Sequence, residues 1–315
     1  MRIAVVGTGA LGSLIANAFC MAGNHVTLVD LPQRLEQISA LGGLVVIGEG
    51  GEQRLATPAG MATDMADAGR HDVVFLATKA FVLPSLARRL ATMVLPDGFF
   101  VTLQNGIPWW YLSGLDHELG GRRLRSLDPD GVLAEHIDPA RIIGCVAYPA
   151  AVLRTDGVVE HVEGLRFPVG ELDGAERDRT RQLSRLFEGA GFKSRVLADI
   201  RSEIWLKAWG ALSINPISAL TRATMADVCS FAPTRALVAE MMREAQAIGE
   251  ALGASFRHPI EKRIEGARAV GQHKTSMLQD VEANRRMELD ALMGAILELA
   301  ELTGCRADAI RTVHA

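Results

Sequence analysis

The chain has few cysteines and no long apolar run. Its four cysteines are widely spaced and form no C-x-x-C pair, so we expect reduced, mostly buried thiols. The eight histidines form no H-E-x-x-H motif and do not lie at ligand spacing from a cysteine, so we expect no metal site. Glycines and polar residues interrupt the apolar stretch 3–22, and no other run approaches the ~20 apolar residues of a membrane span. We expect a cytoplasmic protein without a membrane partner.

An excess of positive charge is also missing. The 33 lysines and arginines are outnumbered by 37 acidic residues, and the net charge of -4 gives no reason to expect a nucleic-acid partner. A length of 315 residues with 49% hydrophobic residues is enough for about two domains, each with its own core.

The first thirty residues carry a nucleotide-binding pattern. An apolar strand, 1–6, leads into a G-x-G-x-x-G motif, a helical run to Cys20, and a second strand, 25–29, that ends in a carboxylate. In this context the glycines permit a tight turn, the approach of a pyrophosphate and close helix packing, while the helix N-terminus faces the phosphates. The expected cofactor contacts here are Gly7, Thr8, Gly9, Ala10, Leu11, Gly12 and Asp30.

The pattern of apolar runs and helix formers along the chain predicts two domains. Up to about residue 198, apolar strands such as 73–77 and 99–103 alternate with helices, which indicates a doubly wound α/β domain of the Rossmann type. Short strands within 142–171 are expected to complete its sheet by antiparallel pairing, with a helix at 175–189 and a last strand at 191–197. Residues 199–315 are rich in helix formers and predict an all-helical domain.

A lysine lies within an apolar helical pattern in the second half. Lys207, Ala211 and Asn215 recur at i, i+4 and i+8, beside a stripe that includes Trp205. Pro216 should kink or stop the helix at Asn215. From position alone, a functional Lys207 and one that reaches solvent are equally acceptable interpretations.

A second polar constellation follows, with Ser276 in S-M-L-Q-D and Glu288 downstream. Taken alone, Ser276 is a helix N-cap and Glu288 a solvated side chain. On one unbroken helix the two would lie roughly 18 Å apart, too far to share a small substrate. If both are functional, the helix must break between them, and Asn284, which tolerates left-handed geometry, is the expected place.

Together these motifs resemble the ketopantoate reductases, the 2-dehydropantoate 2-reductase family. The resemblance spans nearly the whole chain. Its motifs are G-x-G-A-x-G, Thr78-Lys79-Ala80, Asn105-Gly106, W-x-K with Asn215-Pro216 eight residues on, and S-M-L-Q-D with Glu288.

The resemblance implies an oxidoreductase that reduces a 2-oxo acid, most specifically 2-dehydropantoate to pantoate in pantothenate biosynthesis, with NADPH or NADH. It implies that Lys207 and Glu288 are catalytic and that Lys79 lies near cofactor and substrate. A homodimer is an open alternative to a monomer. The substrate contacts that it implies are Asn105, Asn215 and Ser276, with Asn105 also near the cofactor.

Three departures from the family pattern bear on the substrate. The family usually carries asparagine where this chain has Ala211 and commonly threonine where it has Met287. The segment 109–111, Trp-Trp-Tyr, adds aromatic bulk near the mouth of the expected substrate cleft. Because one buried polar contact is worth ~1–3 kcal/mol, these changes leave another 2-oxo acid open as the substrate.

The choice of nucleotide is open at this stage. Asp30 at the end of the second strand favours the 2′-hydroxyl of NADH, whereas the family mostly uses NADPH, and Arg34 is close enough in sequence to reach a 2′-phosphate.

We compare the chain with the motifs expected for other classes of function. Neither tyrosine starts the Y-x-x-x-K of short-chain dehydrogenases, because Leu115 and Val152 stand where the lysine should be. A 3-hydroxyacid dehydrogenase of the β-hydroxyisobutyrate type is the nearest enzyme alternative, but it lacks the N-P and S-M-L-Q-D pairing. A nucleotide-sensing module would need neither Lys207 nor Glu288.

Overall fold

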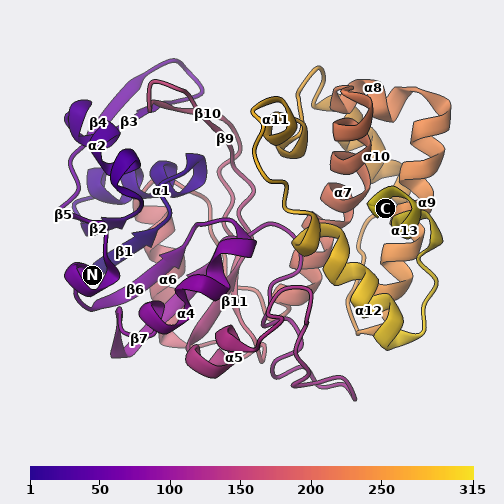
Figure 1. Cartoon of the computed structure of the whole chain (residues 1–315), viewed down its shortest axis with the longest axis horizontal. Coiled ribbons are helices and arrows are strands. Elements are labelled where there is room, and N and C mark those ends of the chain that lie inside the picture. The colour runs from indigo at the N-terminus through magenta and orange to yellow at the C-terminus, as the bar shows by residue number, and fades with distance from the viewer. The chain divides into compact units, whose positions relative to one another are not determined.

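The strands of the first half form a seven-stranded sheet in the computed structural model, which describes residues 1–315 (Figure 1). All neighbouring strands pair in parallel except β11 and β8, which pair antiparallel at one edge of the sheet. In spatial order the strands are β11 (Val169–Glu171), β8 (Ile142–Cys145), β7 (Val94–Thr102), β6 (His71–Leu76), β1 (Arg2–Val6), β2 (His25–Val29) and β5 (Gly60–Ala62).

The order of the six parallel strands confirms the predicted Rossmann-type fold. From β1 the chain steps outward to β2 and then to β5, and it crosses back to β6 on the other side of β1 before continuing outward to β7 and β8. The order reverses between β1 and β6, and in sheets of this kind ligands bind beyond the carboxyl ends of the strands at that point. The Gly7 turn follows β1, and Lys79 follows β6.

A second, smaller sheet corrects two sequence-based expectations. The strands β4 (Gln53–Ala56), β3 (Leu44–Ile47), β10 (Val159–Glu163) and β9 (Ala150–Leu153) pair with one another, so only β8 and β11 of the segment 142–171 complete the main sheet. The expected strand at 191–197 is reduced to two isolated bridges, Arg166 to Lys193 and Val169 to Val196. Alternating polarity predicts a strand but does not specify its partner.

The two sheets of the first unit share one core. Helix α1 (Ala10–Met21) contacts strands of both sheets, and its Phe19 meets Phe75 of β6 and Phe187 of α6 (Asp178–Gly189) with ring centroids 5.2 and 5.5 Å away. These rings are fully buried. The remaining helices of this unit are α2 (Pro32–Ala40), α3 (Met65–Ala68), α4 (Leu83–Leu90) and α5 (Val132–His136), with short 3-10 turns η1 (Ala80–Val82) and η2 (Pro139–Arg141).

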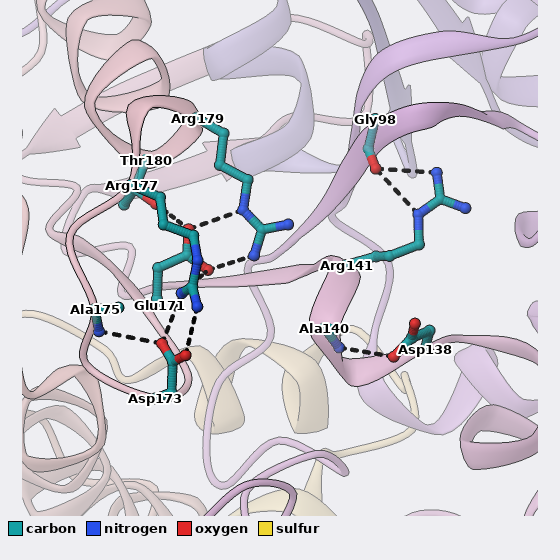
Figure 2. A network of polar contacts seen from close by, with 10 residues as sticks. All are labelled: Gly98, Asp138, Ala140, Arg141, Glu171, Asp173, Ala175, Arg177, Arg179 and Thr180. Carbon is teal, nitrogen blue, oxygen red and sulfur yellow. Dashed lines mark hydrogen bonds and ion pairs between the residues drawn. The ribbon is translucent and has the colours of Figure 1, made fainter.

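A buried carboxylate fastens the edge strand β11 to helix α6. Glu171, 2% exposed, accepts hydrogen bonds from Arg179 and from the hydroxyl of Thr180, and Arg177 lies 3.4 Å away (Figure 2). Nearby, Arg177 also pairs with Asp173 and holds the pKa of that carboxyl well below its ordinary value. A buried carboxylate needs such partners, so this network is structural.

The second unit is helical but is not continuous in sequence. Compact unit one is 1–104 with 132–200, and unit two is 105–131 with 201–315. The sequence predicted two continuous domains, 1–198 and 199–315, and did not foresee that 105–131 packs with the helices. These are α7 (Ile200–Thr221), α8 (Met225–Ser230), α9 (Ala232–Ala251), α10 (Ile260–Ala269), α11 (Ser276–Glu282), the π-helical turn η3 (Asp290–Gly294), α12 (Ala295–Thr303) and α13 (Asp308–His314).

Two helix-ending predictions had different outcomes. Asn284 adopts the left-handed conformation, φ 52°, and α11 ends just before it, as predicted. Helix α7, in contrast, continues past Pro216 to Thr221, so of the two predicted outcomes at Asn215, a kink or a stop, the stop is wrong. Burial along most of α7 stabilises the helix against the loss of one main-chain bond. Even this 22-residue helix is not long and apolar enough to cross a membrane, nor is any other.

Candidate active site

The glycine loop of the first unit is packed too tightly for side chains at two of its three positions. Gly7 has φ +94°, and a Cβ there would lie 2.7 Å from the main-chain N of Thr78. A Cβ on Gly12 would lie 1.9 Å from the carbonyl O of Gly7. A Cβ on Gly9, in contrast, would meet nothing within 4 Å. The loop therefore packs against the end of β6 and against its own helix, and Gly9 faces open space.

This loop fits a dinucleotide. Helix α1 has Gly9 at its N-cap and no side-chain cap, so its first-turn N–H groups are free for phosphate oxygens. Close by, Thr78 follows β6 and Gln104 follows β7, and their atoms Thr78 Oγ1 and Gln104 Oε1 are buried without a hydrogen-bond partner. A ligand with hydroxyl and amide groups would satisfy them.

Asp30 lies at the end of β2 and faces the glycine loop. Its Oδ2 accepts hydrogen bonds from the main-chain N and the Oγ1 of Thr8, the latter at 2.6 Å. Its Oδ1 accepts from the N–H of Leu31 at 2.7 Å. A carboxylate oxygen accepts more than one bond, so Oδ1 retains a lone pair for a hydroxyl donor.

The guanidinium of Arg34 is committed to the protein. Nε donates to the Thr8 carbonyl O at 2.9 Å, and the two terminal nitrogens donate to Ser13 Oγ, Gln37 Oε1 and the Gly157 carbonyl O at 3.1, 2.7 and 3.2 Å. Burial lowers the pKa of Arg34, and the charge of Asp30 opposes this shift. Arg34 therefore ties the glycine loop to α2 and to the β9–β10 turn.

Of the other residues predicted for the cofactor, Ala10 and Leu11 form the first turn of α1 and are partly exposed. Lys79 lies three residues after the end of β6, immediately before η1, and is also partly exposed. The side-chain amide of Gln104 donates to the carbonyl O atoms of Leu76 and Thr78 at 2.7 and 3.0 Å, which fixes the turn that leads to Lys79.

In the second unit, helix α7 is buried on all sides but one. Between Ser202 and Ser218 every residue is buried except Lys207, Ala211 and Asn215, the stripe that the sequence predicted. Lys207 Nζ donates to Oδ1 of Asn105 at 2.7 Å, which joins residues 102 positions apart. The flanking Trp205 and Trp209 are fully buried. Lys207 therefore sits on a narrow open face and is fixed by a neutral acceptor.

Ser276 and Glu288 differ in their exposure. The N-cap of α11 is Thr275, whose Oγ1 accepts from Leu278 N and donates to Ser218 Oγ of α7 at 3.1 Å; Ser276 itself is exposed. Glu288 is only 8% exposed, which contradicts the interpretation as a solvated side chain. A carboxylate this buried is held by specific interactions.

The aromatic segment 109–111 is not at the surface. Trp109, Trp110 and Tyr111 are 7%, 1% and 0% exposed, so the prediction that they add bulk at a cleft mouth is wrong. The hydroxyl of Tyr111 accepts from Trp205 Nε1 at 2.7 Å, and Arg201 donates to the Tyr111 carbonyl O at 2.9 Å. The segment is the core contact of 105–131 with α7.

One connection near these residues was not predicted from the sequence. The main-chain N of Ile107 donates to the carbonyl O of Ala291 at 2.9 Å, three residues after Glu288. The only sequence signal for it was the Asn105-Gly106 pair, which indicated a turn without its partner.

Comparison with known proteins gives matches along the whole chain. The family model described as ketopantoate reductase PanE/ApbA matches residues 3–174, and its C-terminal counterpart matches 199–315. A 2-dehydropantoate 2-reductase from Mesorhizobium japonicum is 45% identical over 303 residues, which cover 96% of this chain and 92% of that protein.

Solved structures of similar fold agree with these sequence matches. A 2-dehydropantoate 2-reductase from Geobacter metallireducens superimposes with a TM-score of 0.87 at 25% identity, covering 100% of this chain and 98% of that one. A D-mandelate dehydrogenase solved with NADH and anilino(oxo)acetate shares the fold with a TM-score of 0.83 at 19% identity, covering 100% and 96%. On the strength of the family matches and the 45% identical relative, the chain belongs to the ketopantoate reductase family.

Proposed function

We propose that this protein reduces a 2-oxo acid to a 2-hydroxy acid with NAD(P)H, and that its substrate is 2-dehydropantoate. The observation that carries the proposal is the lysine on the open stripe of α7, paired with Asn105 across 102 residues. The name of the 45% identical relative supports the substrate. In this proposal residues 1–198 bind the nucleotide and 199–315, with Asn105, bind the substrate.

The chemistry needs one proton donor beside the carbonyl oxygen. When bound, a reduced nicotinamide would supply a hydride to C2 of the oxo acid, so that the electron pair of the C=O π bond would move to oxygen. The Lys207 ammonium stabilises this charge and transfers a proton to the oxygen, which completes the hydroxyl. The neutral amine then regains a proton from water. Asn105 keeps the ammonium in place before the transfer.

The remaining candidates take supporting roles. Glu288 favours the ammonium form of Lys207 through its negative charge. Asn215, two turns beyond Lys207 on the same stripe, and Ser276 donate hydrogen bonds to the substrate. Lys79 attracts negative charge on cofactor or substrate. Each of these roles is a proposal that single substitutions and kinetics with 2-dehydropantoate test.

The substrate assignment is tested by pre-steady-state oxidation of NADH and NADPH with a panel of 2-oxo acids. We expect 2-dehydropantoate to give the highest kcat/KM. A higher value for another 2-oxo acid would move the specificity to that acid, in line with Ala211 and Met287. Activity only with a 3-oxo acid would favour the 3-hydroxyacid dehydrogenase alternative, and binding of nucleotide with no turnover would favour a sensor.

For the cofactor, we propose NADH as the preferred nucleotide. Asp30 Oδ1 retains a lone pair for a ribose hydroxyl, whereas the donors of Arg34 are committed to Thr8, Ser13, Gln37 and Gly157. A 2′-phosphate would meet the Asp30 carboxylate and would have to draw Arg34 away from four acceptors.

Dissociation constants for both nucleotides test this choice. Asp30→Ala should weaken NADH and relieve the repulsion of NADPH. Arg34→Ala should loosen the loop and weaken both nucleotides to a similar extent. A parent protein that prefers NADPH, together with a selective loss of NADPH in Arg34→Ala, would instead assign Arg34 to the phosphate.

A homodimer remains a prediction. A ketopantoate reductase from Staphylococcus aureus described as dimeric has the same fold, with a TM-score of 0.73 at 20% identity. Sedimentation velocity would distinguish a 33.9 kDa monomer from a species of twice that mass.

A further inference from the structure

The five-residue turn η3 is π-helical, whereas the long helices of this chain are α-helices. The N–H of Ala295 donates to the carbonyl O of Asp290, five residues earlier. In an α-helix the same N–H would bond to the carbonyl O of Ala291. The π turn therefore releases the carbonyl of Ala291 from the helix.

The released carbonyl accepts a hydrogen bond from residues 105–107, the Asn105 loop. The N–H of Ile107 donates to Ala291 O at 2.9 Å. Gly106, with φ +83°, lies against the same group, since a Cβ there would be 2.1 Å from Ala291 O and 2.5 Å from Ala291 C. Any side chain at 106 would push the loop off the turn, which explains the glycine that follows Asn105.

Glu288 lies two residues before the same turn. The N–H of Leu292 donates to the Glu288 carbonyl O at 3.2 Å, so Glu288 and Ala291 belong to one short main-chain unit. On the other side, Asn105 Oδ1 holds Lys207 Nζ. Glu288 and Lys207, the two side chains with proposed catalytic roles, are thus connected through the contact of the Asn105 loop with Ala291. Local π turns of this kind are frequent at functional sites.

We propose that the π-helical turn Asp290–Gly294 is a positioning device: its released Ala291 carbonyl and Gly106 dock the Asn105 loop, which keeps Lys207 in register with Glu288. Ala291, Gly106 and Ile107 are positioning residues that touch no substrate. The proposal rests on the proposed reductase function for its kinetic consequences, but the docking itself can be tested without activity.

The first test compares two glycine substitutions in the same segment. Gly106→Ala introduces a Cβ at a positive φ and against Ala291, whereas Gly114→Ala introduces one at φ +66° with nothing within 4 Å. The control therefore carries the backbone strain without the clash. We expect amide hydrogen exchange in 103–108 and 290–295 to accelerate by about tenfold or more in Gly106→Ala and to stay at the parent rate in Gly114→Ala. Equal exchange in the two variants would overturn the docking.

The second test is kinetic. Displacing Asn105 removes an acceptor from the Lys207 ammonium, which makes it a stronger acid. In Gly106→Ala, kcat should fall at least tenfold relative to Gly114→Ala, and the alkaline limb of its kcat–pH profile should move to lower pH. Asn105→Ala should move the limb in the same way, and the double variant no further. A fall in kcat without movement of the limb, or additive movements, would contradict the positioning role.

A third variant covers the case in which Gly106→Ala does not fold. Replacing Ile107 by its α-hydroxy-acid analogue turns the donating N–H into an ester oxygen and adds no atom that could clash. Faster exchange in 290–295 and the same movement of the alkaline limb are expected; parent-like values for both would overturn the proposal. If the parent reduces no 2-oxo acid, the proposed function fails, while the exchange measurements still decide whether the loop is docked.

Discussion

At the scale of single residues, the polar contacts of buried aromatic rings hold the segment 105–131 to α7. Tyr111 is fully buried and is the acceptor for the indole N–H of Trp205. Arg201 adds two donor bonds to the main chain of the segment, at Tyr111 and Ser113. The sequence identified the two tryptophans of α7 as a buried stripe but gave no indication that Tyr111 contacts one of them.

Tyr111→Phe should destabilise the protein by about 1–3 kcal/mol, because it leaves a buried indole N–H without its acceptor. Urea denaturation of the parent and the variant measures this. In a double-mutant cycle with Trp205→Phe, the loss in the double variant should be smaller than the sum of the two single losses. Additive losses would mean that the hydrogen bond contributes nothing beyond packing.

A buried histidine predicts a pH dependence of stability. Burial lowers the pKa of His71 from its ordinary 6.5, and hydrogen bonds to the main chain at Met93 and Gly69 partly oppose this. The unfolded chain therefore takes up this proton at higher pH than the native state. The contribution is fully present above about pH 6.5 and is lost as the pH falls through the folded pKa.

We expect the free energy of unfolding to decline below pH 6.5 in the parent and to decline less steeply in His71→Gln, which does not titrate. Urea denaturation between pH 5 and 8 measures both slopes. Identical slopes would show that His71 does not contribute to the acid sensitivity.

At the scale of elements, α7 shows which features of a helix can be predicted from the spacing of its residues. Its spacing predicted the open stripe of Lys207, Ala211 and Asn215, because side chains four residues apart share a helix face. The stop considered at Asn215 rested instead on the missing N–H of Pro216, and it did not occur, because a helix surrounded by packed neighbours tolerates a missing main-chain bond that an isolated helix would not. The break predicted at Asn284, from the tolerance of asparagine for left-handed geometry, is present at this exposed residue, where packing gives no such support.

The stripe makes Ala211 a position at which specificity can be changed without cost to the core. Ala211→Asn should leave Tm within about 2 °C of the parent and lower KM for 2-dehydropantoate by about tenfold, as one added hydrogen bond predicts. The matched control is Ala208→Asn on the buried face, which should lower stability by about 1–3 kcal/mol. Unchanged KM in a stable Ala211→Asn variant would remove Ala211 from the substrate site.

At the scale of the whole molecule, the alternation of strands and helices in the first half and the change to helices near residue 198 could be predicted, because local pattern determines both. The grouping of 105–131 with the helical unit could not, because it depends on contacts between residues about 100 positions apart. The same distance in sequence separates Lys207 from Asn105. The set of site residues stays a prediction, whereas the contact between Lys207 and Asn105 required the structure.

The discontinuous unit predicts that 199–315 does not fold as an independent domain. Without 105–131 this fragment lacks Tyr111 and Trp110 and exposes the apolar face of α7. Its thermal unfolding, followed by circular dichroism, should be broad, whereas the full chain should unfold cooperatively. A sharp transition of the fragment, with native-like near-ultraviolet signal, would show that the segment is dispensable.

Lys207 is the proposed donor of the proton when a 2-oxo acid is reduced. The most direct test is the turnover of 2-dehydropantoate by the parent and by Lys207→Ala, each saturated with its preferred nucleotide, alongside the nucleotide Kd. We predict a kcat lower by ~10²–10⁴ in the variant with Kd nearly unchanged. Near-normal turnover in Lys207→Ala would contradict the assignment of Lys207 as the proton donor.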